Sequence, residues 1–513
     1  MGGPMNESMP VPRHAEHPSL ADYLEQTLST LERSRIGLIS FNQWSFALGA
    51  VIETALTARS LGAEVTVGLW SGMTPLADTG WTSSRRLGTL LRSPTRDQRA
   101  KQILLAAGVP KSALADPPLK RWRPQALPQL SSPLTRSRIR GLKYRGSDMG
   151  RSILQVHPDA NTPISEGHDW PQRWVSRAMR SYAWAYDQAT ALIQELSLTT
   201  VVVYNGRFTH DRAVAAAAEA LGVRVLYYDT GGYETDFDLT DATTHDWAHL
   251  QERMLAMYES WPVQDRDAIA AQWFTDRQSR IDMANEVFVG IQQRGFLEGV
   301  PDTGLLVVYF SSSGDEIVEL DLDWDRYLQS QENALLELAA VCRSHPEITL
   351  VVRTHPHMRL KPPRDLDDWL AAVERAQPAV HFDPYSQVDS YALMRAAQLV
   401  FTYGSTSGVE AAFMSKPVAV MGPSAYDLLG CARAVSNQSE IQRFLENPPG
   451  PQAERALPYG LMMQRRGFDF AFLHPSVSGE LGRDGVNLVD SGPQVLKLSD
   501  AMKRLQAWWL TRK

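Results

Sequence analysis

Residues 401–412 read Phe401-Thr402-Tyr403-Gly404-Ser405-Thr406-Ser407-Gly408-Val409-Glu410-Ala411-Ala412. The pattern predicts a buried strand over 398–402, a loop of glycines and small hydroxyl residues, and a helix that opens at Gly408. A helix that starts after such a loop points unpaired N–H groups and the positive end of its dipole at an anion. We therefore expect the loop to hold a phosphate, with Glu410 accepting hydrogen bonds from ribose hydroxyls. The alternative is an ordinary strand–loop–helix connection capped by serine.

Length and composition favour a soluble, multidomain protein. With 513 residues and 43% hydrophobic side chains, the chain can form two or three domains with their own cores. Cys342 and Cys431 offer neither a disulfide framework nor a zinc-binding spacing, which fits a reducing compartment. The chain starts without the apolar core of a signal peptide, and no run reaches the roughly 18 apolar residues of a membrane span. We expect a cytoplasmic protein.

The charge of the chain is unevenly distributed. The formal net charge is −7, yet residues 85–151 hold 16 Lys and Arg against Asp97, Asp116 and Asp148, so the rest of the chain carries about −20. Three interpretations stay open: a solvated basic face, a docking surface for an anionic acceptor or membrane phospholipid, and nucleic-acid binding. Nucleic acid is disfavoured because no recognised binding motif accompanies the charge and the whole chain is acidic.

Strands alternate with helices in two blocks, which predicts two parallel sheets facing one another across a cleft. Strands are predicted over 35–40, 64–69, 199–204 and 224–228 in the first block and over 304–310, 349–353, 381–382 and 398–402 in the second. Helices are predicted over 47–61, 170–196, 211–221, 331–343 and 390–397. The turn 41–45 lacks the glycine fingerprint of dinucleotide binding, so we expect no nicotinamide or flavin cofactor.

The predicted division of the chain has four parts. Residues 1–25 form a flexible tail, 26–295 the first domain with the basic insertion 85–151, 296–440 the second domain, and 441–513 an extension. The last helix of the extension, over 494–509, either packs back on the first domain or contacts a membrane surface through Trp508 and Trp509.

Ligands of parallel sheets bind at the carboxyl ends of the strands, and polar groups follow four predicted strands of the second block. We expect them to surround one nucleotide. The predicted donor-binding residues are Ser311, Ser312, Ser313, Arg353, His355, Tyr385, Gly404, Ser405, Thr406, Ser407, Gly408 and Glu410.

These residues resemble a known family, the capsule polysaccharide biosynthesis glycosyltransferases, which include bacterial Kdo transferases of the GT-B type. The resemblance rests on four runs of the second block with landmarks in the first. The runs are Phe310-Ser311-Ser312-Ser313 with Asp315-Glu316, Arg353-Thr354-His355-Pro356, Val388-Asp389-Ser390-Tyr391-Ala392-Leu393, and 402–411 with Lys416-Pro417-Val418. The landmarks are Tyr204-Asn205-Gly206-Arg207 and Tyr227-Tyr228-Asp229-Thr230-Gly231-Gly232.

The resemblance implies an α/β fold of the GT-B type, with two Rossmann-like domains facing a central cleft. It further implies a nucleotide-sugar donor on the second domain, a glycan or glycolipid acceptor on the first, no cofactor and no metal. Kdo members use CMP-linked donors, so a CMP-linked ulosonic acid such as Kdo is favoured. The residues do not separate CMP from UDP or GDP.

Transfer to a hydroxyl needs a base, which we expect from the first domain. Asp229 is the leading candidate because it ends a predicted strand before a Gly-Gly turn that leaves room for a substrate; the alternative is that it caps the turn. The reserves are Glu234, Asp236, His210 and Asp211. His355 is the second catalytic candidate, at the leaving phosphate. The predicted acceptor-binding residues are Asn205, Arg207 and Arg145.

Two acidic pairs match the D-x-D pattern of metal-dependent transferases. They are Asp236 with Asp238 and Asp321 with Asp323. Because two aspartates one residue apart are frequent by chance, we expect no metal site at either pair.

Three other functions stay open. A polyol-phosphate transferase of the teichoic-acid polymerase type would use a CDP donor, and a sugar-nucleotide 2-epimerase would need an acidic cluster that is not evident in the first domain. A nucleotide-binding scaffold of a polysaccharide assembly complex would keep the pocket without the base.

Overall fold

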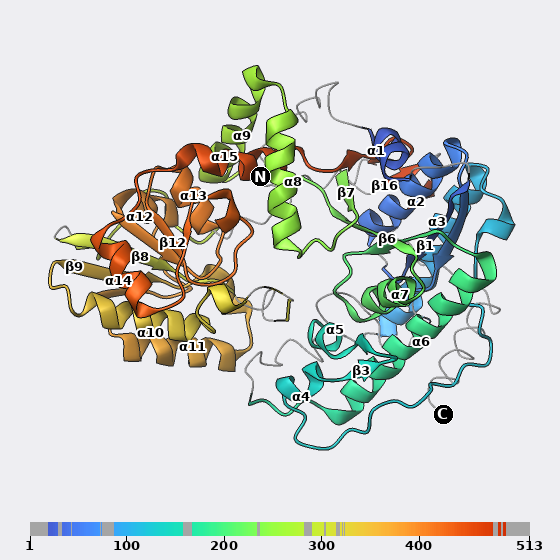
Figure 1. Ribbon diagram of the computed structural model, residues 1–513, viewed down its shortest axis with the longest axis horizontal. Helices are drawn as coiled ribbons and strands as arrows, with labels where there is room; N and C mark the ends of the chain where they lie inside the picture. The colour runs from blue at the N-terminus through green and yellow to red at the C-terminus, as the bar shows by residue number, and fades with distance from the viewer. Residues whose placement is uncertain are drawn as a thin grey trace, which may run out of the picture.

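The structure, a computed structural model, consists of two lobes, each built around one sheet (Figure 1). It describes residues 19–28, 33–42, 44–71, 73, 87–156, 167–232, 236–281, 290–301, 304–313, 319–320, 322, 324–475, 481–483 and 486–488, with the backbone alone for 87–95. Glu234, Asp315, Glu316, Asp321, Asp323 and the predicted helix over 494–509 lie outside the described residues.

The first lobe contains a six-stranded sheet of order β14-β7-β6-β5-β1-β2. Its parallel strands are β1 (Arg35–Ser40), β2 (Glu64–Leu69), β5 (Thr200–Tyr204) and β6 (Arg224–Thr230), and its antiparallel strands are β7 (Asp236–Thr240) and β14 (Phe468–Asp469). The helices that complete the lobe include α1 (Leu20–Thr27), α2 (Ser45–Ser60), α6 (Gln172–Leu196) and α7 (Thr209–Ala220). Every residue of β5 is buried, as expected for an apolar strand covered on both faces.

The second lobe contains a fully parallel sheet of order β10-β9-β8-β11-β12-β13. Its strands are β8 (Leu305–Phe310), β9 (Ile348–Arg353), β10 (Val380–Phe382), β11 (Leu399–Thr402), β12 (Val418–Val420) and β13 (Arg433–Ala434). Its helices are α10 (Gln331–Cys342), α11 (Pro363–Ala376), α12 (Ser390–Ala396), α13 (Ser407–Phe413) and α14 (Gln438–Glu446). Alternate residues of β8 enter separate apolar clusters on the two faces of the sheet.

Both sheets contain a topological switch point. In the first lobe β1 has β2 on one side and β5 on the other, and in the second lobe β8 lies between β9 and β11 in the same way. Ligands of open α/β sheets bind outside the carboxyl ends of the strands at such a point. The sequence motifs at 311–313 and 403–408 follow β8 and β11, so they lie at the switch point of the second sheet.

The predicted alternation of strands and helices is confirmed, and the domain boundary near 295 stays a prediction. Helices α8 (Trp247–Ser260) and α9 (Val263–Gln278), which the sequence assigns to the first domain, place Met254, Trp273 and Phe274 in an apolar cluster of the second lobe. The Phe274 ring stacks on Phe413 of α13 at 4.2 Å between centroids. Apolar packing therefore decides the membership of these helices.

The chain crosses back to the first lobe near its end. Helix α15 (Leu457–Arg465) packs on α8 and α9, and β14 then adds to the edge of the first sheet beside β7. A small sheet follows, formed by β15 (His474–Pro475), β16 (Leu481–Arg483) and β17 (Val486–Asn487). The buried Glu53 carboxylate of α2 accepts the backbone N–H groups of Phe472 and Leu473, each at 2.6 Å.

The basic insertion wraps around α6. It contains α3 (Leu87–Ala106), α4 (Arg136–Arg140), β3 (Lys143–Tyr144), β4 (Ser147–Asp148) and α5 (Gly150–Leu154), and the connection between α3 and α4 runs along the outside of α6 (Figure 1). None of the described helices combines the length and hydropathy needed to cross a lipid bilayer.

Candidate functional site

At the second switch point, hydrogen bonds join the ends of β8 and β9. The Ser311 backbone N–H donates to the Arg353 carbonyl at 3.1 Å, and the Ser311 hydroxyl accepts the His355 backbone N–H at 2.8 Å. Ser311 is buried, so its hydroxyl positions His355. Ser312 is held by its backbone N–H, which donates to the side-chain carbonyl of Gln331 at the start of α10.

His355 begins a short 3₁₀ helix (Pro356–Leu360) and is half-buried. Its Nδ1 accepts the backbone N–H of His357 at 3.2 Å, which in the neutral ring leaves the proton on Nε2. An Nε2–H group is a donor suited to a phosphate oxygen. The local turn therefore selects the tautomer that a phosphate contact needs.

The loop after β11 is shaped by the chain itself. A Cβ on Gly404, whose φ is +75°, would meet the Pro423 carbonyl oxygen at 2.0 Å, and one on Gly408 would meet the Tyr426 hydroxyl at 2.1 Å. The Tyr426 hydroxyl donates to the Ser405 carbonyl at 2.6 Å. The two glycines thus admit the 423–426 segment, and a donor contact of Gly404 and Gly408 stays a prediction.

The hydroxyl residues of this loop differ in exposure. The Ser405 hydroxyl is buried, accepts the Ser407 backbone N–H at 3.3 Å and donates to the Ser407 hydroxyl at 3.2 Å. Thr406 is exposed and Ser407 half-buried. Helix α13 begins at Ser407, one residue before the predicted start. Thr406 and Ser407 are therefore the hydroxyl residues of this loop that a ligand can reach directly.

Arg353 has a structural role that the sequence did not predict. Its guanidinium donates from Nη1 to the Asp383 carbonyl and from Nη2 to the Ser386 carbonyl, the latter at 3.3 Å. The side chain is buried, and burial lowers its pKa to about 10, against the opposing charge of Asp383. These bonds hold the 383–386 turn, and a direct contact between Arg353 and the donor stays a prediction. Tyr385 on the turn is 60% exposed.

Glu410 lies in the first turn of α13 and is buried. Its Oε1 accepts from Nε of Arg277 at 3.1 Å, an ion pair with α9 in which both side chains are at most 7% exposed. Burial, with the negative charge of Glu410, raises the pKa of the neighbouring Tyr391 hydroxyl. The sequence did not predict Arg277, which lies 133 positions before its partner. The contact between Glu410 and the ribose stays a prediction. Arg277 holds the Glu410 carboxylate in place.

The first switch point brings Asn205 and Asp229 together. Asn205 follows β5 in a left-handed backbone conformation, with φ of +49°, and its Nδ2 donates to Oδ2 of Asp229 at 2.5 Å. Oδ1 of Asp229 accepts the Thr230 backbone N–H at 2.8 Å. Asn205 is 2% exposed and its Oδ1 has no hydrogen-bond partner, whereas Asp229 is partly exposed. The Asp229 carboxylate is therefore partly accessible and is held in place by the buried Asn205 amide.

The Gly231-Gly232 turn does not leave room for a substrate. A Cβ on Gly231 would meet Oδ1 of Asp236 at 2.1 Å, and one on Gly232 would meet the Met463 carbonyl oxygen at 2.7 Å. The Gly232 backbone N–H donates to the Arg466 carbonyl at 3.1 Å, so the returning chain fills this space. Among the reserve bases, Asp236, His210 and Asp211 are all buried.

Two predicted acceptor-binding arginines have partners within the first lobe. Nη1 of Arg207 lies 3.1 Å from Nε2 of His245, whose pKa is lowered well below its usual value by burial and by the charge of Arg207. Arg145 pairs through Nε with Asp187 of α6 at 3.0 Å and remains 42% exposed at the side chain. Acceptor binding by either residue stays a prediction.

Of the two D-x-D patterns, the structure describes Asp236 with Asp238, and Asp238 forms a structural ion pair with Arg253. Asp238 of β7 binds Arg253 of α8 through both carboxylate oxygens, each at 3.0 Å. Burial by itself would raise the pKa of Asp238, but the charge and hydrogen bonds of Arg253 leave it lowered. Within the described ranges, no group of three or more His, Cys, Asp or Glu residues has the arrangement of a metal site.

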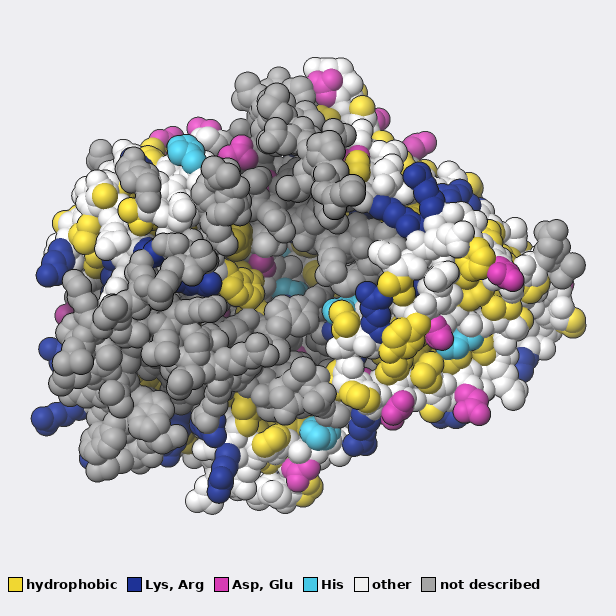
Figure 2. Space-filling view, turned by 180° about the vertical axis from the view of Figure 1, so that it is seen from behind, with side chains coloured by type: hydrophobic (Ala, Val, Ile, Leu, Met, Phe, Trp, Pro, Cys, Tyr) yellow, Lys and Arg dark blue, Asp and Glu magenta, His cyan; other side chains and the backbone are white. Residues whose placement is uncertain are grey.

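Contacts between the lobes link the two switch points. The turn after β6 touches Met463 and Arg466 at the end of α15, α15 packs on α9, and α9 reaches the second switch point through Arg277. Seen from behind, the surface is hollowed between the lobes, with hydrophobic, histidine and acidic side chains at the bottom of the hollow (Figure 2).

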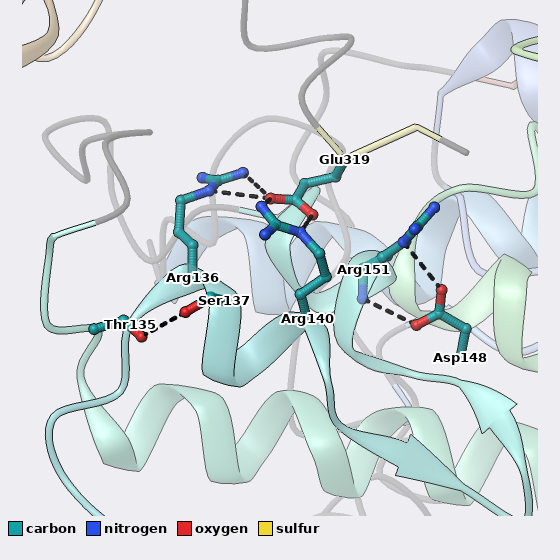
Figure 3. Close-up of polar contacts among 7 residues, drawn as sticks. All are labelled: Thr135, Arg136, Ser137, Arg140, Asp148, Arg151 and Glu319. Atoms are coloured by element: carbon teal, nitrogen blue, oxygen red, sulfur yellow. Dashed lines mark hydrogen bonds and ion pairs between the residues drawn. The ribbon is translucent and has the colours of Figure 1, made fainter. Parts of the chain in front are cut away.

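A second contact joins the lobes on the side of the basic insertion. Glu319, in the segment after β8, accepts from Nε and Nη2 of Arg136 at 3.1 and 2.6 Å and from Nε and Nη2 of Arg140 at 2.9 Å each (Figure 3). The side chains of Arg136 and Glu319 are 1% exposed. The insertion thereby binds Glu319, which follows Ser311, Ser312 and Ser313 in the sequence.

Residues 314–458 match the family described as capsule polysaccharide biosynthesis protein, which confirms the resemblance over that part of the chain. No curated protein matches the chain.

Similar solved structures include two from Thermosulfurimonas dismutans KpsC. The beta Kdo 2,4 transferase is 16% identical over 56% of this chain and 85% of that chain, with a TM-score of 0.36. The beta Kdo 2,7 transferase is 14% identical over 63% and 89%, with a TM-score of 0.33. The UDP-GlcNAc 2-epimerase from Neisseria meningitidis bound to UDP-GlcNAc is 12% identical over 84% and 97%, with a TM-score of 0.26. All three TM-scores are below 0.5, and no functional conclusion follows from them.

Proposed function

We propose that this protein, whose residues 314–458 match the capsule polysaccharide biosynthesis family, is a glycosyltransferase that acts on a bacterial surface glycan or glycolipid. One observation carries the proposal: polar groups that can reach a ligand follow β8, β9 and β11, the three adjacent parallel strands at the switch point of the second sheet. An anionic nucleotide fits such an edge, where side-chain hydroxyls, a histidine and a helix start gather.

The donor is proposed to be a nucleotide-sugar, with a CMP-linked ulosonic acid such as Kdo favoured and a UDP-sugar as the alternative. Thr406, Ser407, Ser313 and the Nε2–H of His355 would contact the phosphate, and Tyr385 offers an exposed aromatic face to the base. Glu410 would accept the ribose hydroxyls. Arg277 supports this role because the ion pair holds the Glu410 carboxylate in place.

The reaction is proposed to be a transfer across the cleft between the lobes. An acceptor hydroxyl attacks the anomeric carbon, the bond between that carbon and the phosphate oxygen breaks, and the proton of the hydroxyl passes to Asp229. The leaving phosphate gains hydrogen bonds from His355 and the start of α13 as its charge develops. Asn205 and Arg207 would contact the acceptor, with Arg145 at a more distant, anionic part of it.

A thermal-shift screen with CMP, CDP, UDP and GDP tests the nucleotide site. A nucleotide that binds the folded protein at a hundredfold excess over its dissociation constant stabilises it by about 2.7 kcal/mol. We expect the largest rise in unfolding temperature with CMP, and a smaller rise in the His355→Ala variant. Lys361→Ala, a substitution beyond the end of the same 3₁₀ helix, is the control. Absence of a shift with all four nucleotides would remove the basis of the proposal.

Product analysis with the matching donor then separates the proposed reaction from the alternatives. A free nucleotide together with a new glycosidic bond supports glycosyl transfer. Release of CMP from a CDP donor with the phosphate transferred would instead indicate a polyol-phosphate transferase. Nucleotide binding without any turnover would favour a scaffold.

A further inference from the structure

Four of the exposed cations of the insertion lie on two segments that α6 holds side by side; they are Lys120, Arg121, Arg123 and Lys143. The Trp122 Nε1–H and the Tyr144 hydroxyl each donate to Oδ2 of Asp187 at 2.8 Å, and Arg145 binds Oδ1 of the same carboxylate. Gln188, the next residue of α6, fixes the backbone of Leu119 through bonds of 2.8 and 3.1 Å. Residues 119–123 and 143–145 therefore form one surface, here called the basic patch.

The charges of the basic patch are uncompensated. Lys120, Arg121, Arg123 and Lys143 are exposed, and none of them forms an ion pair with a described carboxylate. Arg145 neutralises the nearly buried Asp187. The patch thus presents four free positive charges on a lobe edge, whereas the chain as a whole is negative. Figure 2 shows Lys and Arg side chains along the outer edge of this lobe.

An apolar side chain stands among these charges. Leu119 is 39% exposed although its backbone is fixed on both sides by Gln188, so its exposure is built into the fold. Four cations around a projecting leucine match a surface that meets anionic headgroups and inserts one apolar group among them. A soluble polyanion would use the cations and gain little from the leucine.

We propose that the basic patch docks the protein on a membrane rich in anionic phospholipid. The net negative charge of the remaining chain is repelled by the same membrane, so the protein is oriented with the first lobe against the lipid. This inference does not depend on which donor or acceptor the protein uses. It concerns the outer edge of the insertion, whereas Arg136 and Arg140 on its inner side bind Glu319 of the second lobe.

Vesicle co-sedimentation of the full chain tests the proposal. We expect binding to vesicles of phosphatidylglycerol and phosphatidylcholine at about 0.1 M salt, where the screening length is about 10 Å, and none to phosphatidylcholine alone. The variant K120Q/R121Q/R123Q/K143Q should bind at least tenfold more weakly. A matched variant on the second lobe, R364Q/R375Q/R395Q/R443Q, removes four exposed arginines and should bind like the original chain.

Two further measurements distinguish membrane docking from binding to a soluble polyanion and check that the variants are folded. Leu119→Ser leaves the charge unchanged and should weaken vesicle binding about threefold while leaving binding to dextran sulfate unaltered. The proposal is overturned if the original chain does not bind anionic vesicles or binds dextran sulfate alone, and equally if the patch variant binds vesicles as well as the original chain does. Equal unfolding temperatures of all variants confirm that each one is folded.

Discussion

At the scale of single residues, three polar residues of the two switch points are each hydrogen-bonded to a buried side chain that holds them in place. Asn205 supports Asp229, Ser311 supports His355, and Arg277 supports Glu410. In each case the supporting side chain is buried, so its own rotamer is restricted by packing. The buried partner thereby gives the reactive group a defined position.

The Asn205 and Asp229 pair gives a kinetic prediction. Asp229→Asn should lower kcat at least a hundredfold, because the acceptor hydroxyl loses its base, while the affinity for donor stays within about twofold. Asn205→Gly keeps a residue that tolerates positive φ but removes the amide, and should lower kcat by about tenfold. Full transfer activity of Asp229→Asn would show that the base lies elsewhere.

A glycine substitution elsewhere serves as the control for Asn205→Gly. Gln377 also has a left-handed backbone, with φ of +50°, at the end of α11 and away from both switch points. Gln377→Gly should therefore leave kcat unchanged. If both glycine variants lost activity equally, the effect would come from backbone freedom and the role of the amide would be rejected.

At the scale of elements, the sequence predicted β1, β2, β5, β6, β8, β9, β10 and β11 and the order of motifs, but not the supporting side chains. Periodicity and β-branched runs mark β5 and β8 clearly, because an apolar strand buried on both faces differs from its surroundings. The supports depend on distant pairs such as Arg277 with Glu410, and one sequence contains no signal that relates them. Likewise the sequence predicts Gly404 as a donor-binding residue but contains no signal that this glycine makes room for the Pro423 carbonyl.

The ion pair between β7 and α8 gives a pH prediction. The pKa of Asp238 is lowered in the folded protein, so its contribution to stability is present above the unfolded pKa of about 4 and is lost as pH falls through the folded value. Asp238→Asn should lower the unfolding free energy by about 2–3 kcal/mol at pH 7 and by less near pH 3, as measured by urea denaturation.

The matched control is the exposed pair of Arg364 with Asp368, where both side chains are 55% exposed. Asp368→Asn should change the unfolding free energy by less than about 0.5 kcal/mol at either pH. A loss for Asp238→Asn that stayed the same between pH 7 and pH 3 would mean that packing, and not charge, stabilises this contact.

At the scale of the whole molecule, the lobes are joined on two sides. Helices α8, α9 and α15 connect them along one side, and the bonds of Arg136 and Arg140 to Glu319 connect them along the other. Glu319 follows the Ser311–Ser313 motif by six positions, so this ion cluster relates the proposed donor site to the insertion.

Removing one member of this cluster should be costly. Glu319→Leu leaves Arg136 buried without its partner and should destabilise the protein by about 3–5 kcal/mol, whereas the double change R136M/E319L should cost less than either single change. Thermal or urea unfolding of the four proteins gives the coupling energy. Arg151→Met, at a neighbouring and partly exposed ion pair with Asp148, should cost less than about 1 kcal/mol. Additive losses at Arg136 and Glu319 would contradict a direct coupling.

The return of the chain to the first lobe also has a consequence for biosynthesis. The edge strand β14 and the residues that satisfy Glu53 lie at 468–473, behind the whole second lobe in the order of translation. Domains generally form in the order in which they leave the ribosome. Until the second lobe has been synthesised, β7 therefore remains an edge strand of the amino-terminal sheet. Over the same period the Glu53 carboxylate lacks the backbone N–H donors of Phe472 and Leu473. The earliest part of the chain to emerge is therefore among the last to be completed.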